Sequence, residues 1–302
     1  YTIVYTLSLH DALPICAGNT AQLNAWLASN GGAVASDVCS NVTWSNNFAS
    51  VSDTCGATGS ATVTFTATDN CGNSSTTSAT FTIIDDTDPT ITNQAANLEV
   101  QCDGSGNTAQ LNAWLASNGG AVASDVCSNV TWTNNFASVS DTCGATGSAT
   151  VTFTATDACG NTSTTSATFT IIDDTDPTIT TQAANLEVQC DGSGNTAQLN
   201  AWLASNGGAV ASDVCSNVTW TNNFASVSDT CGATGSATVT FTATDDCGNA
   251  STTSATFTII DDTDPTITTQ ASNLEVQCDG AGNTGSEERR VGKEGTLSCR
   301  SR

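Results

Sequence analysis

Basic side chains are almost missing from this chain of 302 residues, which has five Lys and Arg residues, one His and no Met. All five Lys and Arg residues lie after position 288, and residues 17–284 contain no Lys, Arg or His. Catalysis by a Ser–His–Asp, Cys–His or Lys-based mechanism is therefore excluded in this central part. This central part, whose charged side chains are all acidic, also excludes nucleic acid as a partner, because phosphates would be repelled and no Lys or Arg could release counterions. The same repulsion applies to an anionic membrane surface, and no apolar run is long enough for membrane insertion.

The two ends of the chain differ from everything between them. Residues 5–15 resemble a translated strand of sequencing-adapter DNA, and residues 286–294 resemble the translation of its reverse complement. We therefore predict that residues 1–16 and 285–302 are adapter-derived and belong to no domain. The alternative at the front is a secretory or lipoprotein signal around "LPIC", but it lacks a basic region, and His10 and Asp11 interrupt its apolar run.

The central part is an internal repeat. Trp26, Trp114 and Trp202 are each 88 residues apart, and the same spacing relates the cysteines. This period predicts a first repeat at 17–88 that lacks its opening strand, complete repeats at 89–176 and 177–264, and a stub of a fourth repeat at 265–284. A unit of this size can form a core of its own but is near the small end, where additional cross-links are common.

Alternation of apolar residues with threonine predicts strands in the later part of each repeat. In "ATVTFTATD", Val151 and Phe153 alternate with threonines, and "ATFTII" continues the pattern with Phe169 and Ile171. "NLEVQ" and "NVTWTNNF" follow the same pattern earlier in the repeat. Short strands without helices between them predict an all-β chain of tandem immunoglobulin-like antiparallel β-sandwiches.

One segment of each repeat has helical spacing instead. In "NTAQLNAWLASNGG", Leu111, Trp114 and Leu115 lie at positions i, i+3 and i+4, Asn107 or Thr108 can begin a helix, and two glycines can end it. We predict one short helix that covers an end or edge of each sandwich. Its Trp is interpreted as core packing, with a platform for a sugar ring as the alternative.

The strand motifs also resemble a known class of repeat. "GSATVTFTATDACGN" followed by "SATFTIIDDTDP" is similar to the HYR-type and related immunoglobulin-like repeats of large bacterial surface and secreted proteins, including the adhesin-like arrays of Bacteroidetes. Its "TVTFTATDACGN" part recurs in all three copies, at 62–73, 150–161 and 238–249. The resemblance implies a sandwich fold and an extracellular or cell-surface adhesin. The helical segment and the cysteine positions differ from plain HYR modules, so the resemblance implies no disulfide pattern.

Four cysteines in each full repeat, with no His and no CxxC pair, favour disulfides over the alternative of a zinc site. In an immunoglobulin-like topology, the loops with Cys127 and Cys159 share one end of the sandwich, and Cys102 and Cys143 share the other. We predict Cys127–Cys159 and Cys102–Cys143, each stabilising the fold by about 3–4 kcal/mol. The alternative pairs neighbours, Cys102–Cys127 and Cys143–Cys159. In the other repeats the predicted disulfide cysteines are Cys39, Cys71, Cys190, Cys215, Cys231 and Cys247.

Acidic residues gather where one repeat ends and the next begins. "IIDDTDPT" places three carboxylates within four residues, and no Lys or Arg can neutralise them. The final strand of a sandwich points toward two loops of its successor, which carry two more aspartates. We predict a shared Ca²⁺ ion, because hard cations bind carboxylate oxygens. Its predicted ligands are Asp85, Asp86, Asp88, Asp125 and Asp157 at the first joint, and Asp173, Asp174, Asp176, Asp213 and Asp245 at the second. The alternative is a solvated acidic linker, extended by self-repulsion.

These patterns predict a non-catalytic stalk or spacer region of a bacterial cell-surface or secreted adhesin, whose partners are the neighbouring repeats of the same chain. The alternatives are tandem modules that bind a glycan or a surface by avidity, and modules appended to a secreted hydrolase. A carboxylate pair acting on a glycoside is the one catalytic arrangement left open, but the acids lie in turns and no long loops frame a cleft. The outward threonine rows suggest an ice- or polysaccharide-binding face, although threonine is also a common exposed strand residue.

Overall fold

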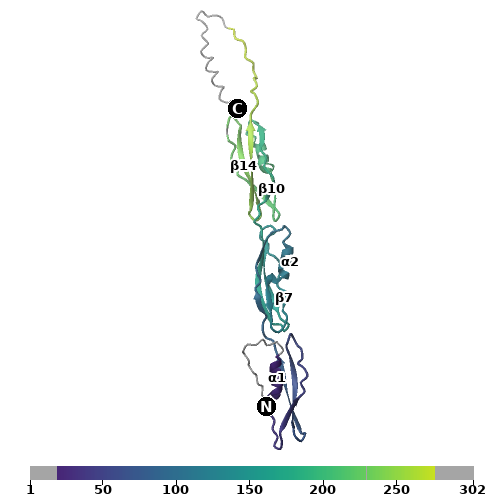
Figure 1. Cartoon of the computed structure of the whole chain (residues 1–302). Coiled ribbons are helices and arrows are strands. Elements are labelled where there is room, and N and C mark those ends of the chain that lie inside the picture. The colour runs from purple at the N-terminus through teal and green to yellow at the C-terminus, as the bar shows by residue number, and fades with distance from the viewer. Residues whose placement is uncertain (1–18, 229, 276–302) are drawn as a thin grey trace. The chain divides into compact units, whose positions relative to one another are not determined.

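The computed structural model describes residues 19–228 and 230–275, and the chain divides into two compact units, residues 1–173 and 174–302. We call residues 17–88, 89–176 and 177–264 modules 1, 2 and 3, and Figure 1 colours the chain by residue number. Unit 1 holds module 1 and most of module 2, up to Asp173, and unit 2 begins at Asp174. The predicted adapter segments lie outside the described residues. Residues 265–275, the described part of the predicted stub, contain no helix or strand.

Module 2 has a four-stranded sheet in the order β5-β9-β8-β7 and a separate pair, β4-β6. The strands are β4 (Thr90–Asn93), β5 (Leu98–Gln101), β6 (Val122–Ser124), β7 (Thr131–Asn134), β8 (Gly147–Thr156) and β9 (Thr162–Ile172). Burial along β8 alternates as predicted: Ala149, Val151, Phe153 and Ala155 are buried and the threonines between them are not. The chain is therefore all-β with repeated sandwich-like modules, and the predicted strands are confirmed.

One strand pair differs from the predicted antiparallel arrangement. β5 lies parallel to β9, with Leu98 opposite Phe169 and Val100 opposite Ile171. A parallel neighbour needs a long connection rather than a hairpin, and here about 60 residues, including a helix and three strands, separate β5 from β9. The antiparallel pairs β7–β8 and β8–β9 make up the rest of the sheet.

The predicted helix is α2 (Thr108–Ala116), followed by the short helix η2 (Asn118–Gly120). It covers the face of the sheet rather than an end or edge, because Leu111 and Trp114 belong to the same core cluster as Phe153 and Phe169. The Trp114 ring meets Phe153 edge-on at a centroid distance of 5.3 Å, and its Nε1 donates to Ala96 O at 3.0 Å. The indole is therefore core packing with its one donor satisfied, and Figure 1 shows α2 beside the long strands.

Asn107 begins the helix but does not cap it with its side chain. It has a left-handed backbone, with φ of 50°, and is fully buried. Its Nδ2 donates to Gln101 O at 2.7 Å, and its Oδ1 accepts the N–H of Asp103 at 3.2 Å. Asn107 thus closes the loop between β5 and α2 instead of pairing with the first turn of the helix.

Module 3 repeats this arrangement in unit 2, with the sheet β11-β15-β14-β13 and the pair β10-β12. Its elements are β10 (Thr178–Thr181), β11 (Leu186–Gln189), α3 (Thr196–Ala204), η3 (Asn206–Gly208), β12 (Val210–Ser212), β13 (Val218–Asn222), β14 (Gly235–Asp245) and β15 (Ala250–Ile260). The described part of module 1 has the sheet β1-β2-β3. Its elements are α1 (Thr20–Ala28), η1 (Asn30–Gly32), β1 (Val42–Asn46), β2 (Gly59–Asp69) and β3 (Ser74–Ile83).

Gly147, the first residue of β8, is predicted to tolerate no side chain. A Cβ there would overlap the carbonyl oxygen of Ser140, which belongs to backbone and cannot turn away. We expect Gly147→Ala to lower the free energy of unfolding of module 2 by about 3 kcal/mol, the upper range for overpacking. Calorimetry of the whole chain would measure the change. Ala158→Asn, which installs the residue that module 1 has at the equivalent exposed position, is the control and should leave the transition within about 0.5 kcal/mol.

Candidate functional site: the joint between modules 1 and 2

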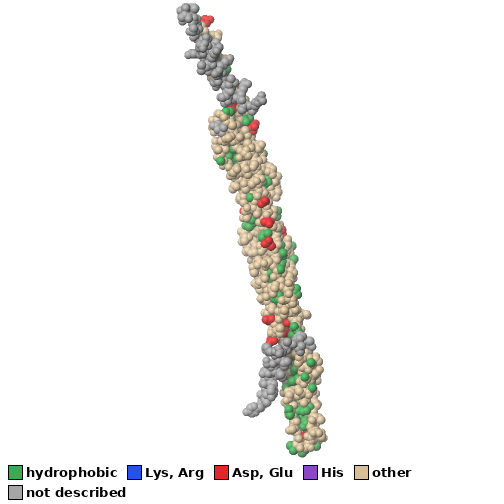
Figure 2. Space-filling model, turned by 60° about the vertical axis from the view of Figure 1, so that its left-hand side comes forward, with side chains coloured by type: hydrophobic (Ala, Val, Ile, Leu, Met, Phe, Trp, Pro, Cys, Tyr) green, Lys and Arg blue, Asp and Glu red, His purple; other side chains and the backbone are tan. Residues whose placement is uncertain are grey.

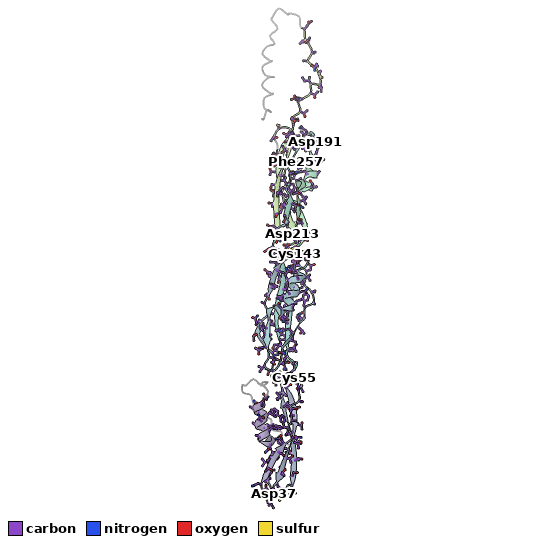
Figure 3. All side chains as sticks on the ribbon, turned by 45° about the vertical axis from the view of Figure 1, so that its right-hand side comes forward. Asp37, Cys55, Cys143, Asp191, Asp213 and Phe257 are labelled. Atoms are coloured by element: carbon purple, nitrogen blue, oxygen red, sulfur yellow. A yellow bond between two sulfur atoms is a disulfide. The ribbon has the colours of Figure 1, made fainter. Side chains whose placement is uncertain are left out.

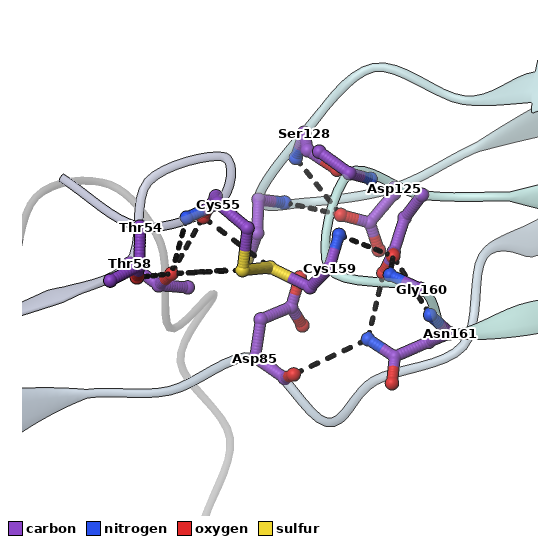
Figure 4. Close-up of a disulfide and its surroundings, with 12 residues drawn as sticks. Thr54, Cys55, Thr58, Asp85, Asp125, Ser128, Cys159, Gly160 and Asn161 are labelled. Carbon is purple, nitrogen blue, oxygen red and sulfur yellow. Dashed lines mark hydrogen bonds between the residues drawn. A yellow bond between two sulfur atoms is a disulfide. The ribbon is translucent and has the colours of Figure 1, made fainter.

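A disulfide connects module 1 to module 2. Cys55 is bonded to Cys159, with Cα atoms 5.1 Å apart and a sequence separation of 104 (Figure 4). Hydrogen bonds also cross the joint, among them those from Ala57 N to Cys127 O (3.1 Å), from Asn161 Nδ2 to Asp85 O (3.3 Å) and from Thr162 N to Asp88 Oδ1 (3.2 Å). The two modules are therefore joined by a disulfide in addition to the polypeptide chain that runs between them.

The predicted disulfide pairing is wrong for Cys159. Its partner is Cys55 of the preceding module, so neither Cys127 nor the alternative partner Cys143 is bonded to it. The unbonded thiols in the described residues are Cys39, Cys71, Cys190 and Cys231, whereas Cys102, Cys127, Cys143, Cys215 and Cys247 are disulfide-bonded. The within-module pairs predicted for modules 1 and 3 by analogy, Cys39–Cys71 and Cys190–Cys231, are therefore not formed.

The physical reason lies in the two ends of a module. Figure 3 shows Asp37 and Cys55 at opposite ends of module 1. The loop with Cys71 is at the Asp37 end, because the N–H of Asn70 donates to Ser40 Oγ at 3.3 Å. In the pair of modules 1 and 2, the end of module 1 that carries Cys55 meets the end of module 2 that carries Cys159. Cys159 is the equivalent in module 2 of Cys71 in module 1. This contact exists only in a pair of modules.

The turn that carries Cys55 is shaped for a close approach. The N–H and the Oγ1 of Thr58 both donate to Cys55 O, at 3.1 and 2.6 Å. Gly56 has a positive φ of 55°, and a Cβ on it would lie 2.8 Å from Cys127 O. Glycine is therefore needed at position 56 for two reasons, the left-handed backbone conformation and the close contact with module 2. Thr58 is only 6% exposed at this joint.

The Cys159 loop of module 2 is organised by Asp157. Its Oδ1 accepts the N–H groups of Cys159 (2.8 Å), Gly160 (2.7 Å) and Asn161 (2.9 Å), and its Oδ2 accepts Asn161 Nδ2 at 2.8 Å. Burial alone would raise the pKa of Asp157, but these hydrogen bonds outweigh it and hold the pKa below the usual value. Asp157 thus positions Cys159, and both its oxygens are already engaged.

Asp85 and Asp125 face each other at the same joint. Asp125 Oδ2 accepts the N–H groups of Cys127 and Ser128, at 2.7 and 3.0 Å. A ligand atom of Asp85 lies within 4.8 Å of those of Asp125 and Cys127, and Asp85 Oδ2 is buried without a hydrogen-bond partner. Burial raises the pKa of Asp85, and the negative charges of neighbouring aspartates raise it further, against the opposing N–H of Thr87. The N–H of Thr87 therefore does not offset the burial and the like charges that an ionised Asp85 meets here.

This donor set fits a hard cation better than a soft one. Cys127 is disulfide-bonded and offers no thiolate, so a zinc-type site is not available. The carboxylates of Asp85 and Asp125 are suitable oxygen ligands, but Ca²⁺ takes six to eight, so water would have to supply most of them. Asp157 is a predicted ligand, but both of its carboxylate oxygens accept hydrogen bonds from its own loop.

The remaining predicted ligands lie elsewhere. Asp88 accepts the N–H of Thr162, and Asp86 is exposed. In unit 2, Asp176 Oδ1 accepts the N–H of Ala250 at 3.2 Å, and Asp213 and Asp245 repeat the loop hydrogen bonds of Asp125 and Asp157. Asp173 ends unit 1 and Asp174 begins unit 2, so the second ion remains a prediction.

The outer surface offers few groups that could bind a ligand. Figure 2 shows a face on which acidic side chains form small groups and most of the surface is uncharged. The outward hydroxyls of β8 and β9 bond to one another across the strands, Thr150 with Thr168 at 3.0 Å and Thr152 with Ser166 at 2.9 Å. These pairs satisfy one another and stabilise the sheet.

Cys55 is the functional residue that sequence reasoning missed. The within-module partner that the predicted pairing implies for Cys55 falls before module 1 begins, so the sequence predicts no bond for it. The available signal was the repeat itself, which places one cysteine in a turn at one end of every module and another in a loop at the opposite end. Two such modules in tandem bring the two cysteines together.

No protein-family model and no curated protein matches the chain. Solved structures with partial likeness include mouse clustered PcdhgC3 EC1-3, at 13% identity over 68% of this chain and 79% of that one, with a TM-score of 0.27. Drosophila N-cadherin EC1-4 is 10% identical over 69% of this chain and 59% of that one, with a TM-score of 0.26. In the described residues, no helix has the length and hydropathy to cross a membrane.

Proposed function

We propose that this chain is a non-catalytic structural repeat region, the stalk or spacer of a bacterial cell-surface or secreted adhesin, in which each module is fastened to the next. The observation that carries the proposal is the Cys55–Cys159 disulfide, which links neighbouring modules instead of stabilising one of them. Disulfides of this kind are stable in an oxidising, extracellular environment. The resemblance of the strand motifs to HYR-type repeats supports the adhesin context.

Ca²⁺ is the proposed ligand of the joint, held by Asp85 and Asp125. The support is the buried, unpartnered Asp85 Oδ2 beside a second carboxylate. A folded pKa above the unfolded value means that Asp85 stabilises the joint only where it is protonated, below its unfolded pKa. That contribution is lost as pH rises through the folded pKa, so at neutral pH the joint carries an electrostatic cost. A bound cation would remove this cost without a proton.

We expect Ca²⁺ to raise the midpoint of thermal unfolding of the oxidised whole chain at pH 7. The rise should be saturable, with half-saturation at about 0.1–1 mM, the range of weak extracellular sites. At ten times the dissociation constant the gain would be about 1.4 kcal/mol. Mg²⁺ should have a much smaller effect, because it holds its water and demands a rigid octahedral site. Calorimetry with EGTA as the zero point would measure the response.

The variant Asp85→Asn separates a bound ion from a simple charge effect. In EGTA at pH 7 we expect it to be more stable than the parent chain, by about 1 kcal/mol, because an amide replaces an uncompensated carboxylate. It should also lose the Ca²⁺ response. Asp86→Asn removes the same charge from an exposed side chain and should keep that response. If the parent chain ignores Ca²⁺ while Asp85→Asn still stabilises it, the joint is an acidic linker without an ion.

The alternative function, glycan binding by avidity, makes a different prediction. A stalk should show no saturable depletion from solution by insoluble cellulose, chitin or xylan. A binder should show it and should lose it when the half-buried Trp132 and Trp220 are changed to Ala, since aromatic rings are the usual sugar platforms. Saturable binding that depends on these side chains would overturn the stalk proposal in favour of this alternative.

A further inference from the structure

The Cys55–Cys159 disulfide and the carboxylates of Asp85 and Asp125 lie in one small cluster at the joint between modules 1 and 2 (Figure 4). A carboxylate oxygen of Asp85 lies within 4.8 Å of one of Asp125. Neither bonded cysteine is fully buried. Residues 84–89, which carry Asp85 between β3 and β4, contain no helix or strand. The position of Asp85 therefore depends on contacts at the joint rather than on a regular element.

The turn of module 2 that follows Asp125 contacts the segments on both sides of the disulfide. Cys127 O accepts the N–H of Ala57 from module 1 at 3.1 Å. Ser128 Oγ accepts the N–H of Ala158, the residue before the bonded cysteine of module 2, at 3.0 Å. The disulfide therefore joins the same two segments that hold the Asp125 turn in place.

Asp85 is connected to the Cys159 loop through Asn161. The Nδ2 of Asn161 donates to Asp85 O at 3.3 Å and to Asp157 Oδ2 at 2.8 Å. This contact fixes the backbone of Asp85, whereas Oδ2 of its carboxylate is buried without a hydrogen-bond partner. The joint therefore holds the carboxylate in place while a hydrogen bond from the next turn of chain satisfies only its other oxygen.

The charges around Asp85 are all negative. Burial contributes most to its raised pKa, and the charges of Asp125, Asp157 and Asp86 add to it. Residues 17–284 contain no Lys, Arg or His that could offset these charges. Like charges repel more strongly in a partly buried site than in bulk water. At neutral pH the closed joint therefore carries a repulsion that opening of the joint would relieve.

We propose that the Cys55–Cys159 disulfide is a redox switch that keeps the joint closed against the repulsion between its own carboxylates. The charge on Asp85 then determines how readily the disulfide is reduced. Reduction frees the Cys55 turn from the Cys159 loop and lets Asp85 move away from Asp125. This inference rests on the joint proposed above as the fastening point of a stalk, but it does not require Ca²⁺.

The reductant is a low-molecular-weight thiol such as glutathione. Its thiolate attacks one sulfur of the disulfide, which forms a mixed disulfide and releases the other cysteine, and a second glutathione then displaces the first. The S–S bond of the protein breaks, and its two cysteines gain two electrons and two protons. Two glutathione thiols become one oxidised glutathione, so the exchange is balanced and reversible.

Asp85→Asn should make the disulfide harder to reduce. The whole chain is equilibrated at pH 7 in EGTA with glutathione buffers of graded ratio and alkylated. Cleavage before aspartate then releases the linked peptides 53–68 and 157–172, which are quantified. A Thr62→Ser change in every chain compared distinguishes 53–68 from its identical copies at 141–156 and 229–244. We expect the equilibrium constant for forming the disulfide to rise at least about fivefold, the lower end of coupling between sites.

Asp86→Asn is the matched control, because it removes the same charge from an exposed side chain. It should change the equilibrium constant by less than about twofold, since exposed charges are screened by water and salt. A shift for Asp85→Asn that is no larger than the shift for Asp86→Asn would overturn the redox switch.

Calorimetry gives a second measurement that needs no redox buffer. In EGTA, Asp85→Asn should raise the midpoint of thermal unfolding of the oxidised chain. The same change should have no effect in a chain that also carries Cys55→Ser and Cys159→Ser, because its joint can already open. The two changes form a double-mutant cycle, whose interaction energy measures the coupling. An equal rise in both backgrounds would show that the charge acts independently of the disulfide and would contradict the proposal.

Ca²⁺ separates this inference from the ion proposed for the joint. Saturating Ca²⁺ should strengthen the disulfide of the parent chain as Asp85→Asn does, because a bound cation offsets the same charge, and this result would support both proposals. An effect of Asp85→Asn without an effect of Ca²⁺ would support the redox switch and overturn the ion. Linkage of Cys159 to a cysteine other than Cys55 would overturn both the fastened stalk and the switch.

Discussion

Replacing Cys55 and Cys159 together with Ser is expected to lower the free energy of unfolding of unit 1 by up to about 4.7 kcal/mol, the value for closing a loop of about 100 residues in the unfolded chain. The sequence separation of 104 makes this a long loop, longer than either predicted within-module pairing would close. The loss should be seen for both modules, because the bond restricts each of them. Chemical denaturation of the oxidised chain, followed by Trp fluorescence, would measure it.

The control for this prediction is Cys71→Ser. Cys71 occupies the position in module 1 that Cys159 occupies in module 2, but it is unbonded and exposed. Its replacement should change stability by less than about 0.5 kcal/mol. If Cys71→Ser were as damaging as the double variant, or if the double variant were as stable as the parent chain, the assignment of the cross-link to the module joint would be wrong.

Truncating Phe153 is the second change with a large expected effect. Its ring is fully buried and meets the Trp114 ring edge-on, so Phe153→Ala removes core volume and an aromatic pair at once. We expect a loss of about 3–5 kcal/mol from module 2. Hydrogen exchange would localise it, because residues 157–172 of module 2 and 246–260 of module 3 give distinguishable peptides.

Phe136→Ala is the matched comparison, since it deletes the same atoms from a half-buried position outside the strands. Its cost should be less than half that of Phe153→Ala, because less apolar surface is exposed to water on its removal. Module 3 should be protected equally in both variants. Equal costs at the two positions would contradict the core described for module 2.

The strands were predictable because alternation is a local property. Val151 and Phe153 are fully buried, and the threonines beside them are not, which a period of two already implies. The helix was predictable for the same reason, from Leu111 and Trp114. Its place on the sheet face was not, because spacing shows which side of a helix is apolar but not which surface it packs against.

The joint was only partly predictable. The sequence correctly placed Asp125 and Asp157 on loops of one end, where the structure brings them near Asp85. It could not show that the Asp157 carboxylate accepts hydrogen bonds from the backbone of its own loop, because such bonds depend on the directions of the backbone N–H groups. The predicted cysteine pairing was wrong for a different reason. A bond between Cys55 and Cys159 forms only between two neighbouring modules, whereas the predicted pairs lie within one module.

Disulfide mapping of the oxidised whole chain tests the central claim most directly. A Thr62→Ser change marks the Cys55 peptide, residues 53–68, so that its mass differs from the equivalent Cys143 peptide, and cleavage before aspartate releases Cys159 in residues 157–172. The structure predicts that the 157–172 peptide is linked to the marked 53–68 peptide. Linkage of Cys159 to the unmarked Cys143 peptide, or to the Cys127 peptide at 125–140, would show that the modules are closed individually and would contradict a stalk of covalently joined modules.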